Sequence, residues 1–491
     1  MKKKQAAIIG AGIAGLASAI RLRAQGHDVS VFEANNYPGG KLTAFEKMGY
    51  RFDMGPSLFT MPHLVEDLFK VAKKPIHSYF KYKKKKNICT YFFEDGTYFE
   101  APAEQKEFAK KAAKTFDISE KELANYLNQS KKKYDLTAPL FLEKSLHKTS
   151  TYLSKKTLKA AINIGVLDLN KSLSALNEKT FRDPRLVQFF NRFATYNGSS
   201  PYKTPGIMSM IPHLEQHYGT YFPVGGMHQI TLCLFNLAKD IGVKFEFNSP
   251  VDEIITQDNR TTGLLVNQKR IQADLVISNA DIVPTYRRLL PKHKAPERTL
   301  SQPRSSSALI FYWGIKKTFP QLDLHNIFFS KDYQKEFEHI FEKQSVYDDP
   351  TIYLNISSKD APKDAPKGCE NWFTMINVPN NTGQDWDTVI ERSRTKIIDK
   401  LSRLLKQDIT ELIEQESILD PRTIESKTQS YQGALYGASS NNKFAAFLRH
   451  PNFKSNLQNL YFCGGSVHPG GGIPLCLLSG KIVADLIEKD E

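Results

Sequence analysis

The stretch that decides the fold is residues 5–33, QAAIIGAGIAGLASAIRLRAQGHDVSVFE. It begins with an apolar run, breaks at GAGIAG (residues 10–15), and continues with apolar residues at helical spacing. A second apolar run with alternating valines follows Gly26 and ends at the acidic residue Glu33. The pattern predicts a strand, a tight turn, a helix and a second strand.

The three glycines of this turn each have a mechanical purpose. Gly10 allows the turn, Gly12 lets the backbone approach a pyrophosphate, and Gly15 lets the helix lie close to the strand. The helix N-terminus supplies unpaired N–H groups and partial positive charge for phosphates. Glu33 stands where its carboxylate can accept hydrogen bonds from a ribose diol. The stretch therefore predicts a dinucleotide site.

A secretory signal peptide is the alternative interpretation of the N-terminus, because lysines followed by an apolar stretch and small residues are typical of one. We reject it for two reasons. No cleavage-like site precedes polar sequence, and the acid at position 33 falls where a dinucleotide turn requires one.

The composition limits the class of protein. The 491 residues suffice for about two to four domains, and 41% hydrophobic residues can fill their cores. The net charge of +15 favours anionic partners, either nucleic acid or a membrane face. No recognised nucleic-acid motif accompanies the charge, so we expect no nucleic-acid partner. No apolar stretch approaches the length of a spanning helix, which leaves peripheral attachment to a membrane surface.

The five cysteines are scattered along the chain and form no CxxC pair. This pattern predicts a reducing compartment and argues against a disulfide framework, a thiol relay or a metal site. Together with the charge, it predicts a protein on the cytoplasmic side that associates peripherally with the membrane.

The first half of the remaining chain predicts a hairpin and then helices. Residues 76–100 alternate and contain an Asp-Gly pair, which predicts a hairpin with its turn at Asp95-Gly96. Residues 103–193 predict lysine-rich helices, including one over 141–176. That stretch interleaves apolar residues with Lys144, Lys148, Lys155, Lys156 and Lys159. This pattern is equally compatible with a surface that binds anionic lipid and with an ordinary solvated helix face.

The second half predicts two further α/β segments. Helix 228–239 is followed by strands that begin at Val251 and continue at 262–266 and 271–277. Strands 308–313, 352–355 and 372–378 accompany a helix over 388–405. Near the end, strand 459–463 leads through the glycine-rich loop 464–472 into a helix. The positive end of that helix dipole can face a group that the first motif already binds. A reduced flavin suits this position because it carries negative charge.

Taken together, these motifs resemble the bacterial phytoene-desaturase type of carotenoid desaturase, within the FAD-dependent amine oxidoreductase superfamily. The resemblance spans nearly the whole chain and is most specific in two stretches, Gly198-Ser-Ser-Pro-Tyr202 and His468-Pro-Gly-Gly-Gly-Ile-Pro474. Within this family the chain is most similar to desaturases that act at C-3,4 of hydroxylated carotenoids, although no single motif carries that similarity. Cys476 departs from the family pattern, and we expect it to pack as a helix residue, with an influence on the flavin as the alternative.

The resemblance implies an α/β fold. A Rossmann-like FAD-binding domain of the glutathione-reductase-like type would be interleaved with a mixed-sheet substrate domain and a helical, membrane-facing region. The FAD-binding domain would comprise residues 1–70, 220–300 and 415–491. The substrate domain would comprise 71–102 and 301–414, and the helical region would comprise 103–219.

The motifs and the resemblance together predict the residues that bind FAD. They are Gly10, Gly12, Ala14, Gly15, Glu33, Ala34, Gly40, Lys41, Gly55, Pro56, Ser57, Leu58, Val251, Asn279, Gly464, Gly465, Gly472, Ile473 and Pro474.

The activity implied by the resemblance is removal of two hydrogens from a C–C bond beside a polyene. Flavin N5 would accept a hydride and the neighbouring carbon would lose a proton, which the adjacent cation already makes acidic, so water or a weak carboxylate suffices. The partners would be a long apolar carotenoid, the membrane surface, and a quinone or oxygen as electron acceptor. No second nucleotide motif is present that could serve a nicotinamide cofactor.

The catalytic base is not fixed by any motif. His468 and Asp53 are the two candidates, and a backbone-capping histidine and a turn-stabilising aspartate are the favoured alternatives. Other members of the superfamily remain as rival functions: phytoene desaturase proper, a carotenoid or retinoid isomerase or saturase, and, less compatible with the terminal Pro-Gly-Gly-Gly, an amine oxidase.

Overall fold

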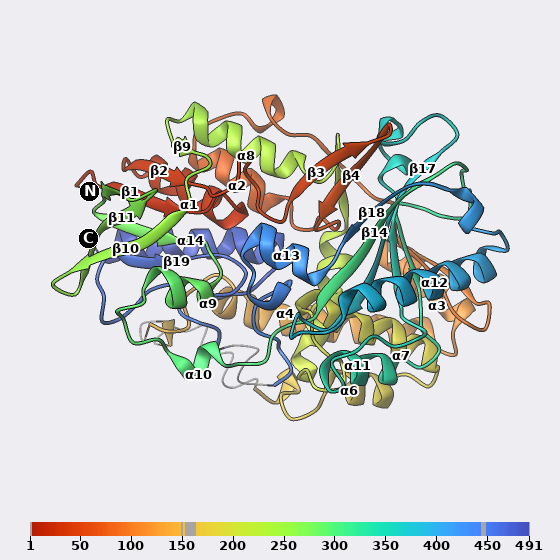
Figure 1. Cartoon of the computed structure of the whole chain (residues 1–491). Coiled ribbons are helices and arrows are strands. Elements are labelled where there is room, and N and C mark those ends of the chain that lie inside the picture. Colours follow the sequence, from red (N-terminus) through yellow and green to blue (C-terminus); the bar gives the residue numbers. More distant parts are fainter. Residues whose placement is uncertain (1, 149–150, 153–163, 443–447, 491) are drawn as a thin grey trace.

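The computed structural model describes residues 2–148, 151–152, 164–442 and 448–490. Its strands form two main sheets that occupy opposite ends of the molecule, with the helices packed around and between them (Figure 1). Both chain termini lie at the end that contains the smaller of these two sheets.

The smaller main sheet has five parallel strands in the order β19-β13-β1-β2-β9. The strands come from three distant parts of the chain: β1 (Gln5–Ile9), β2 (Asp28–Phe32), β9 (Lys244–Glu246), β13 (Leu275–Ser278) and β19 (Leu460–Phe462). Helix α1 (Ile13–Ala24) connects β1 to β2, so the predicted strand, turn, helix and strand are confirmed. The carboxyl ends of all five strands lie at one edge, where ligands bind in open parallel sheets.

Helix α1 is covered by α8 (Gln229–Asp240) and α14 (Ile473–Asp490). The contact with α14 is close because Gly480 has no side chain. A Cβ atom there would lie 2.9 Å from the Cβ of Ala17 and 3.0 Å from the carbonyl oxygen of Ala14. The chain's last helix is therefore fitted directly against its first.

A three-stranded antiparallel sheet borders the parallel one and corrects one prediction. It consists of β10 (Val251–Gln257), β11 (Arg260–Val266) and β12 (Lys269–Gln272). The single strand predicted over 271–277 is wrong, because the chain leaves this sheet after β12 and enters the parallel sheet as β13. At the crossing, the Asp274 carboxylate accepts a hydrogen bond of 2.7 Å from the Gln5 backbone N–H.

The larger main sheet has seven strands in the order β18-β14-β17-β16-β15-β6-β7. Only the β15–β6 pair is parallel. The strands are β6 (Asn87–Phe92), β7 (Tyr98–Pro102), β14 (Ser307–Ile315), β15 (His325–Phe328), β16 (Ile352–Asn355), β17 (Glu370–Val378) and β18 (Ile413–Leu419). β6 and β7 confirm the predicted hairpin with its Asp95-Gly96 turn. The expected domain boundary between residues 414 and 415 falls inside β18.

The two faces of this large sheet have different environments. One face packs against α12 (Trp386–Leu405) through a core that includes Trp313, Trp372 and Trp386, all at most 1% exposed. Burial of three indole rings contributes several kcal/mol, on the order of 2–3 each. On the opposite face, Tyr312 and Phe373 share a core with Phe52 of the hairpin over residues 43–55. At the other end of that face, Tyr91 packs against Phe189 of the helices between β7 and β8 (Tyr221–Pro223).

Those helices are α3 (Gln105–Thr115), α4 (Glu120–Phe141), α6 (Leu173–Thr180) and α7 (Pro184–Asn191). Helix α4 begins at a capping box in which Ser119 and Glu122 bind each other's backbone N–H groups. In the described part of the helix predicted over 141–176, only Phe141 in α4 and residues 173–176 in α6 are α-helical, so the prediction is wrong for 142–148 and 164–172. α4 ends at Phe141, residues 142–148 form turns, and Ile164–Leu167 is a short 3₁₀ helix. Lys155, Lys156 and Lys159 lie outside the described residues.

The remaining elements connect these layers. They are the helices α2 (His63–Val71), α9 (Ile282–Pro284), α10 (Glu297–Leu300), α11 (Tyr333–Phe341) and α13 (Pro421–Thr428), and the strands β3 (Thr43–Lys47), β4 (Tyr50–Gly55), β5 (Tyr82–Lys84) and β8 (Tyr221–Pro223).

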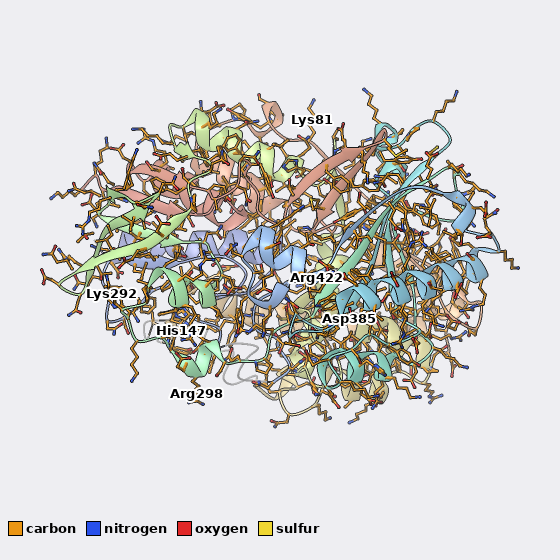
Figure 2. All side chains as sticks on the ribbon, viewed as in Figure 1. Lys81, His147, Lys292, Arg298, Asp385 and Arg422 are labelled. Atoms are coloured by element: carbon orange, nitrogen blue, oxygen red, sulfur yellow. The ribbon has the colours of Figure 1, made fainter. Side chains whose placement is uncertain are left out.

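Many of the charged side chains lie at the surface, although some, such as Glu33, Arg192 and Glu215, are buried. Lys81, Lys292 and Arg298 are exposed and project from the outline of the molecule (Figure 2). Among the residues that the structure describes, no helix combines the length and the apolar character needed to cross a membrane.

Candidate functional site

Two glycine-rich loops meet around the side chain of Asn279, which follows β13 directly. Its Nδ2 donates to the carbonyl oxygen of Gly10 at 3.3 Å. A Cβ atom on Gly12 would lie 2.8 Å from Nδ2, and one on Gly464 would lie 2.8 Å from Oδ1. The loop after β1 and the loop after β19 are therefore held against opposite sides of one amide, and neither has room for a side chain at these positions.

The N-terminus of α1 has no protein cap. Its N-cap residue is Gly12, which has no side chain to accept a hydrogen bond, and the first turn contains no acidic residue. Gly40 approaches from the opposite side, where its Cβ position lies 3.7 Å from the Cα of Gly12. The helix therefore presents free N–H groups and its positive dipole end to a ligand. This arrangement fits a pyrophosphate.

Glu33 is held rigidly at the end of β2. The side chain is 6% exposed, its Oε2 accepts the backbone N–H of Ala11 at 2.8 Å, and its Oε1 accepts that of Asn35 at 2.9 Å. Its neighbour Ala34 is exposed. The carbonyl oxygen of Glu33 in turn accepts the N–H of Ser249, which brings the start of β10 at Val251 to the same edge.

Lys41 lies between the first glycine-rich turn and the C-terminal third of the chain. Its Nζ donates to the carbonyl oxygens of Ala434 and Leu435, at 3.1 and 2.9 Å. Burial lowers the pKa of this amine, which the carboxylate of Asp281 opposes. The predicted phosphate or ribose contact of Lys41 stays a prediction; the contacts present join two loops.

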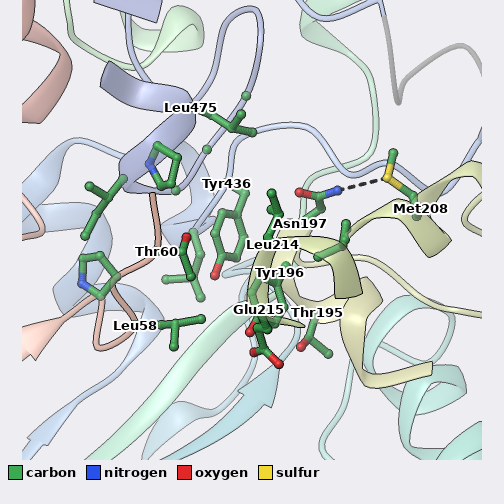
Figure 3. A pocket seen from close by; sticks show the side chains of 18 of the residues that line it. Leu58, Thr60, Thr195, Tyr196, Asn197, Met208, Leu214, Glu215, Tyr436 and Leu475 are labelled. Atoms are coloured by element: carbon green, nitrogen blue, oxygen red, sulfur yellow. Dashed lines mark hydrogen bonds between the residues drawn. The ribbon is translucent and has the colours of Figure 1, made fainter. Parts of the chain in front are cut away.

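A cavity of about 270 Å³ lies between these loops and the large sheet. One side is formed by residues 56–58 and 470–475, and the floor by strands β6, β15, β16 and β17. The third side comes from segments 192–197 and 208–215 in the helical part of the chain. Figure 3 shows Leu58 and Leu475 on the side of the loops and Tyr196 and Glu215 on the helical side. Most of the lining is apolar, as a long hydrocarbon requires.

Six of the predicted flavin-binding residues line this cavity: Pro56, Ser57, Leu58, Gly472, Ile473 and Pro474. The hydroxyl of Ser57 donates to that of Tyr353 in β16 at 2.8 Å, which ties the loop to the sheet. Gly465 backs onto Gly471, since a Cβ on Gly465 would lie 3.2 Å from the Cα of Gly471. The predicted residues are thus spread from the edge at Glu33 to the cavity.

The two candidate bases differ in position. His468 lines the cavity, is 2% exposed, and places its Nε2 2.8 Å from the carbonyl oxygen of Lys144. Burial lowers its pKa to about 4, so the ring is neutral at pH 7. Asp53 is not among the lining residues; its carboxylate accepts hydrogen bonds from Arg51 and from the backbone N–H groups of Met227 and His228. Those contacts match a turn-stabilising aspartate.

Sequence reasoning missed the polar groups on the far side of the cavity. Arg192 and Glu215 form a buried ion pair of 3.0 Å, and His325 faces them from β15. Burial lowers the pKa of His325 to about 3, so this ring is also neutral. Arg192 stands six residues before the Gly198–Tyr202 stretch, in a segment whose sequence contains nothing that marks a partner 23 positions away.

Cys476 packs as expected for a helix residue. Its thiol lies on α14 near Gly465, 3.9 Å from where a Cβ of that glycine would be. Burial raises its pKa to about 11, which keeps the thiol protonated.

The family of the chain follows from a comparison with known proteins. Residues 13–488 match the family described as flavin containing amine oxidoreductase. The chain belongs to the flavin-containing amine oxidoreductase family. This confirms the superfamily that the motifs indicated and the FAD cofactor. The uncapped helix, the glycine cradle and the buried Glu33 of this flavoprotein fit that cofactor.

Individual relatives cover the flavoprotein from end to end. It is 59% identical over 484 residues to the 1-hydroxycarotenoid 3,4-desaturase of Flavobacterium sp. (strain P99-3), with 99% of each chain covered. It is 34% identical over 495 residues to the 4,4'-diaponeurosporene oxygenase of Staphylococcus aureus (strain MSSA476), again with 99% of each covered. An oxidoreductase from Methanosarcina mazei shares the fold, with a TM-score of 0.64, 17% identity, and coverage of 99% of this chain and 100% of that one.

The glycine cradle can be tested by adding one methyl group. In Gly12→Ala the new Cβ would meet the Asn279 amide at 2.8 Å. Overpacking of this kind costs about 1–3 kcal/mol, so FAD should bind roughly tenfold or more weakly. Flavin content after purification and titration of the apoprotein with FAD measure the effect. Gly165→Ala, where a Cβ would have no described residue within 4 Å, is the matched control and should bind FAD normally; equal affinities would contradict the assignment.

The buried His468 predicts a loss of stability in acid. Its pKa is about 4 in the folded chain against 6.5 ordinarily, so between those pH values the unfolded chain binds more protons. Stability should fall as the pH drops from about 6.5 to 4, by up to about 3 kcal/mol for this residue. His468→Gln, which keeps a donor for the Lys144 carbonyl, should show a shallower fall of melting temperature with pH. Parallel curves for the two proteins would refute the burial argument.

Proposed function

We propose that this flavoprotein is a carotenoid desaturase that introduces a C=C bond at C-3,4 of a 1-hydroxycarotenoid. The observation that carries the proposal is the mostly apolar cavity that ends at the loop 56–58 and at the glycine-rich loop 470–475. The 59% identity to a protein named 1-hydroxycarotenoid 3,4-desaturase supports the choice of substrate and position.

The residues that would hold FAD extend from the carboxyl edge of the parallel sheet to the cavity. The pyrophosphate would meet the N-terminus of α1 at Gly12, the adenosine ribose would meet Glu33, and the ring system would lie beside residues 56–58 and 471–474. When bound, FAD supplies a two-electron acceptor that takes a hydride from an activated C–H bond. The division into an FAD-binding unit (1–70, 220–300, 415–491), a substrate unit (71–102, 301–414) and a helical unit (103–219) belongs to the same proposal.

The chain itself positions the substrate and excludes water. Most of the cavity wall is aliphatic or aromatic, so a long polyene can be held against the loops mainly by apolar contacts. A carbon chain that has lost a hydride is positively charged, which makes the neighbouring C–H bond acidic. A weak acceptor such as the neutral His468 imidazole, or a water molecule, is then a sufficient base.

The substrate would enter from a membrane surface. The segment after α4 supports this, because Leu142 and Leu146 line the cavity while Lys144 is exposed and Tyr152 is 51% exposed. A basic surface with an aromatic side chain suits anionic lipid headgroups. We further propose that the enzyme lies on the cytoplasmic face of the membrane and passes its electrons to a quinone or to oxygen.

Anaerobic reduction of the flavin is the direct test. Mixing the holoenzyme without oxygen with a 1-hydroxycarotenoid in liposomes should bleach the oxidised flavin band, and the carotenoid spectrum should shift to the red. A carotenoid that already carries the 3,4 double bond is the control and should leave the flavin oxidised. Unchanged flavin with an altered cis/trans pattern would assign an isomerase instead, and oxygen incorporated into the product in air would assign an oxygenase.

A further inference from the structure

The cavity contains a charged pair that its apolar walls do not explain. The Arg192 Nη2 donates to Glu215 Oε2 at 3.0 Å, and their side chains are only 9% and 2% exposed. Both residues line the cavity, and Glu215 is the only carboxylate among its described lining residues. Burying an ion pair is usually no better for stability than a well-packed apolar pair. Its position in a cleft is therefore a reason to look for a ligand.

The guanidinium is held in place by aromatic rings. Its central carbon lies 4.3 Å from the ring centre of Phe193, 5.3 Å from that of Tyr91 and 5.6 Å from that of Tyr196. These contacts favour the cation and fix the plane of the guanidinium group. The aromatic contacts therefore hold the Arg192 guanidinium in one orientation at the cavity, and a second carboxylate is not needed to fix it.

The pair has hydrogen-bonding capacity that the protein leaves unused. The Nε of Arg192 and the hydroxyl of Tyr196 are both buried and lack a hydrogen-bond partner among the described residues. A buried polar group without a partner costs free energy that a ligand can recover. The pair as a whole carries no net charge, so it suits a neutral ligand better than an anionic one.

We propose that the Arg192–Glu215 pair, with the hydroxyl of Tyr196, is the subsite that binds the hydroxyl group at the end of the carotenoid substrate. An alcohol can accept one hydrogen bond from the guanidinium or the Tyr196 hydroxyl and donate one to a carboxylate. Most of the remaining lining is hydrocarbon, and the other arginine among its described residues, Arg449, donates to the carbonyl oxygens of Tyr436 and Gly465. The Arg192–Glu215 pair can therefore determine which end of a long molecule enters beside the flavin loops. This inference rests on the proposed function and adds to it the residues that distinguish a hydroxylated end from a hydrocarbon end.

The test compares two substrates that differ only in the hydroxyl. Anaerobic flavin reduction is measured with a 1-hydroxycarotenoid and with the same carotenoid lacking the hydroxyl, in vesicles of one lipid composition. The wild-type holoenzyme should reduce its flavin with the hydroxylated substrate more efficiently, by about 10- to 100-fold in kcat/KM, the range expected for hydrogen bonds to a charged group. Failure of both substrates to reduce the flavin would instead refute the proposed function.

Three variants locate the effect. Arg192→Met and Glu215→Gln should remove most of the preference by slowing the hydroxylated substrate. Tyr196→Phe deletes a hydroxyl that has no hydrogen-bond partner in the described parts of the chain, so it should fold normally and lose part of the preference. Arg185→Met removes another arginine of the same segment, paired with Asp183 and absent from the cavity lining, and should leave the preference unchanged.

Two results would overturn the assignment. A wild-type enzyme that treats both substrates alike has no hydroxyl subsite. Variants at 192, 196 and 215 that slow both substrates equally would give the pair a role in folding or in proton transfer. If Arg192→Met does not fold, Tyr196→Phe decides the question alone, since its preference must still fall.

Discussion

The structure depends on the close approach of backbone to backbone around the Asn279 amide. Gly12, Gly15 and Gly464 can pack this closely around that side chain because they carry none themselves. Their packing brings the first, middle and last thirds of the chain to one edge of the parallel sheet. It also leaves the N-terminus of α1 without a side-chain cap among the described residues. The N–H groups there lack hydrogen-bond acceptors, and the oxygens of a pyrophosphate can supply them.

The same edge of the parallel sheet also determines where the flavin and the substrate would meet. From Glu33 the predicted cofactor residues run past the α1 N-terminus to the loops at 56–58 and 471–474, which form one wall of the cavity. The large sheet supplies the floor and the helical part of the chain supplies the third wall. A mostly apolar cavity binds many hydrocarbon chains, and its buried ion pair would distinguish them by the polar group at one end. This suits a substrate that is almost entirely polyene.

Patterns of short range could be predicted from the sequence, and contacts of long range could not. The β1–α1–β2 unit, the β6–β7 hairpin and helices α8 and α12 follow from periodicity and turn residues within about 20–30 positions. The strand predicted at 271–277 was wrong because a chain can change sheets inside one apolar run. The helix predicted at 141–176 was wrong over 142–148, because Leu142 and Leu146, which line a cavity, imitate a helical stripe. The partnership of Arg192 with Glu215 depends on how two helical turns pack, which no local pattern records.

The measurement that tests the central claim most directly is a single anaerobic turnover with a 1-hydroxycarotenoid deuterated at C-3 and C-4. The account predicts that flavin bleaching is slowed by a primary isotope effect and that the product has lost one deuterium from each carbon and gained a conjugated double bond. Retention of all the deuterium, or bleaching at the same rate as with the unlabelled substrate together with a new double bond elsewhere in the chain, would contradict it.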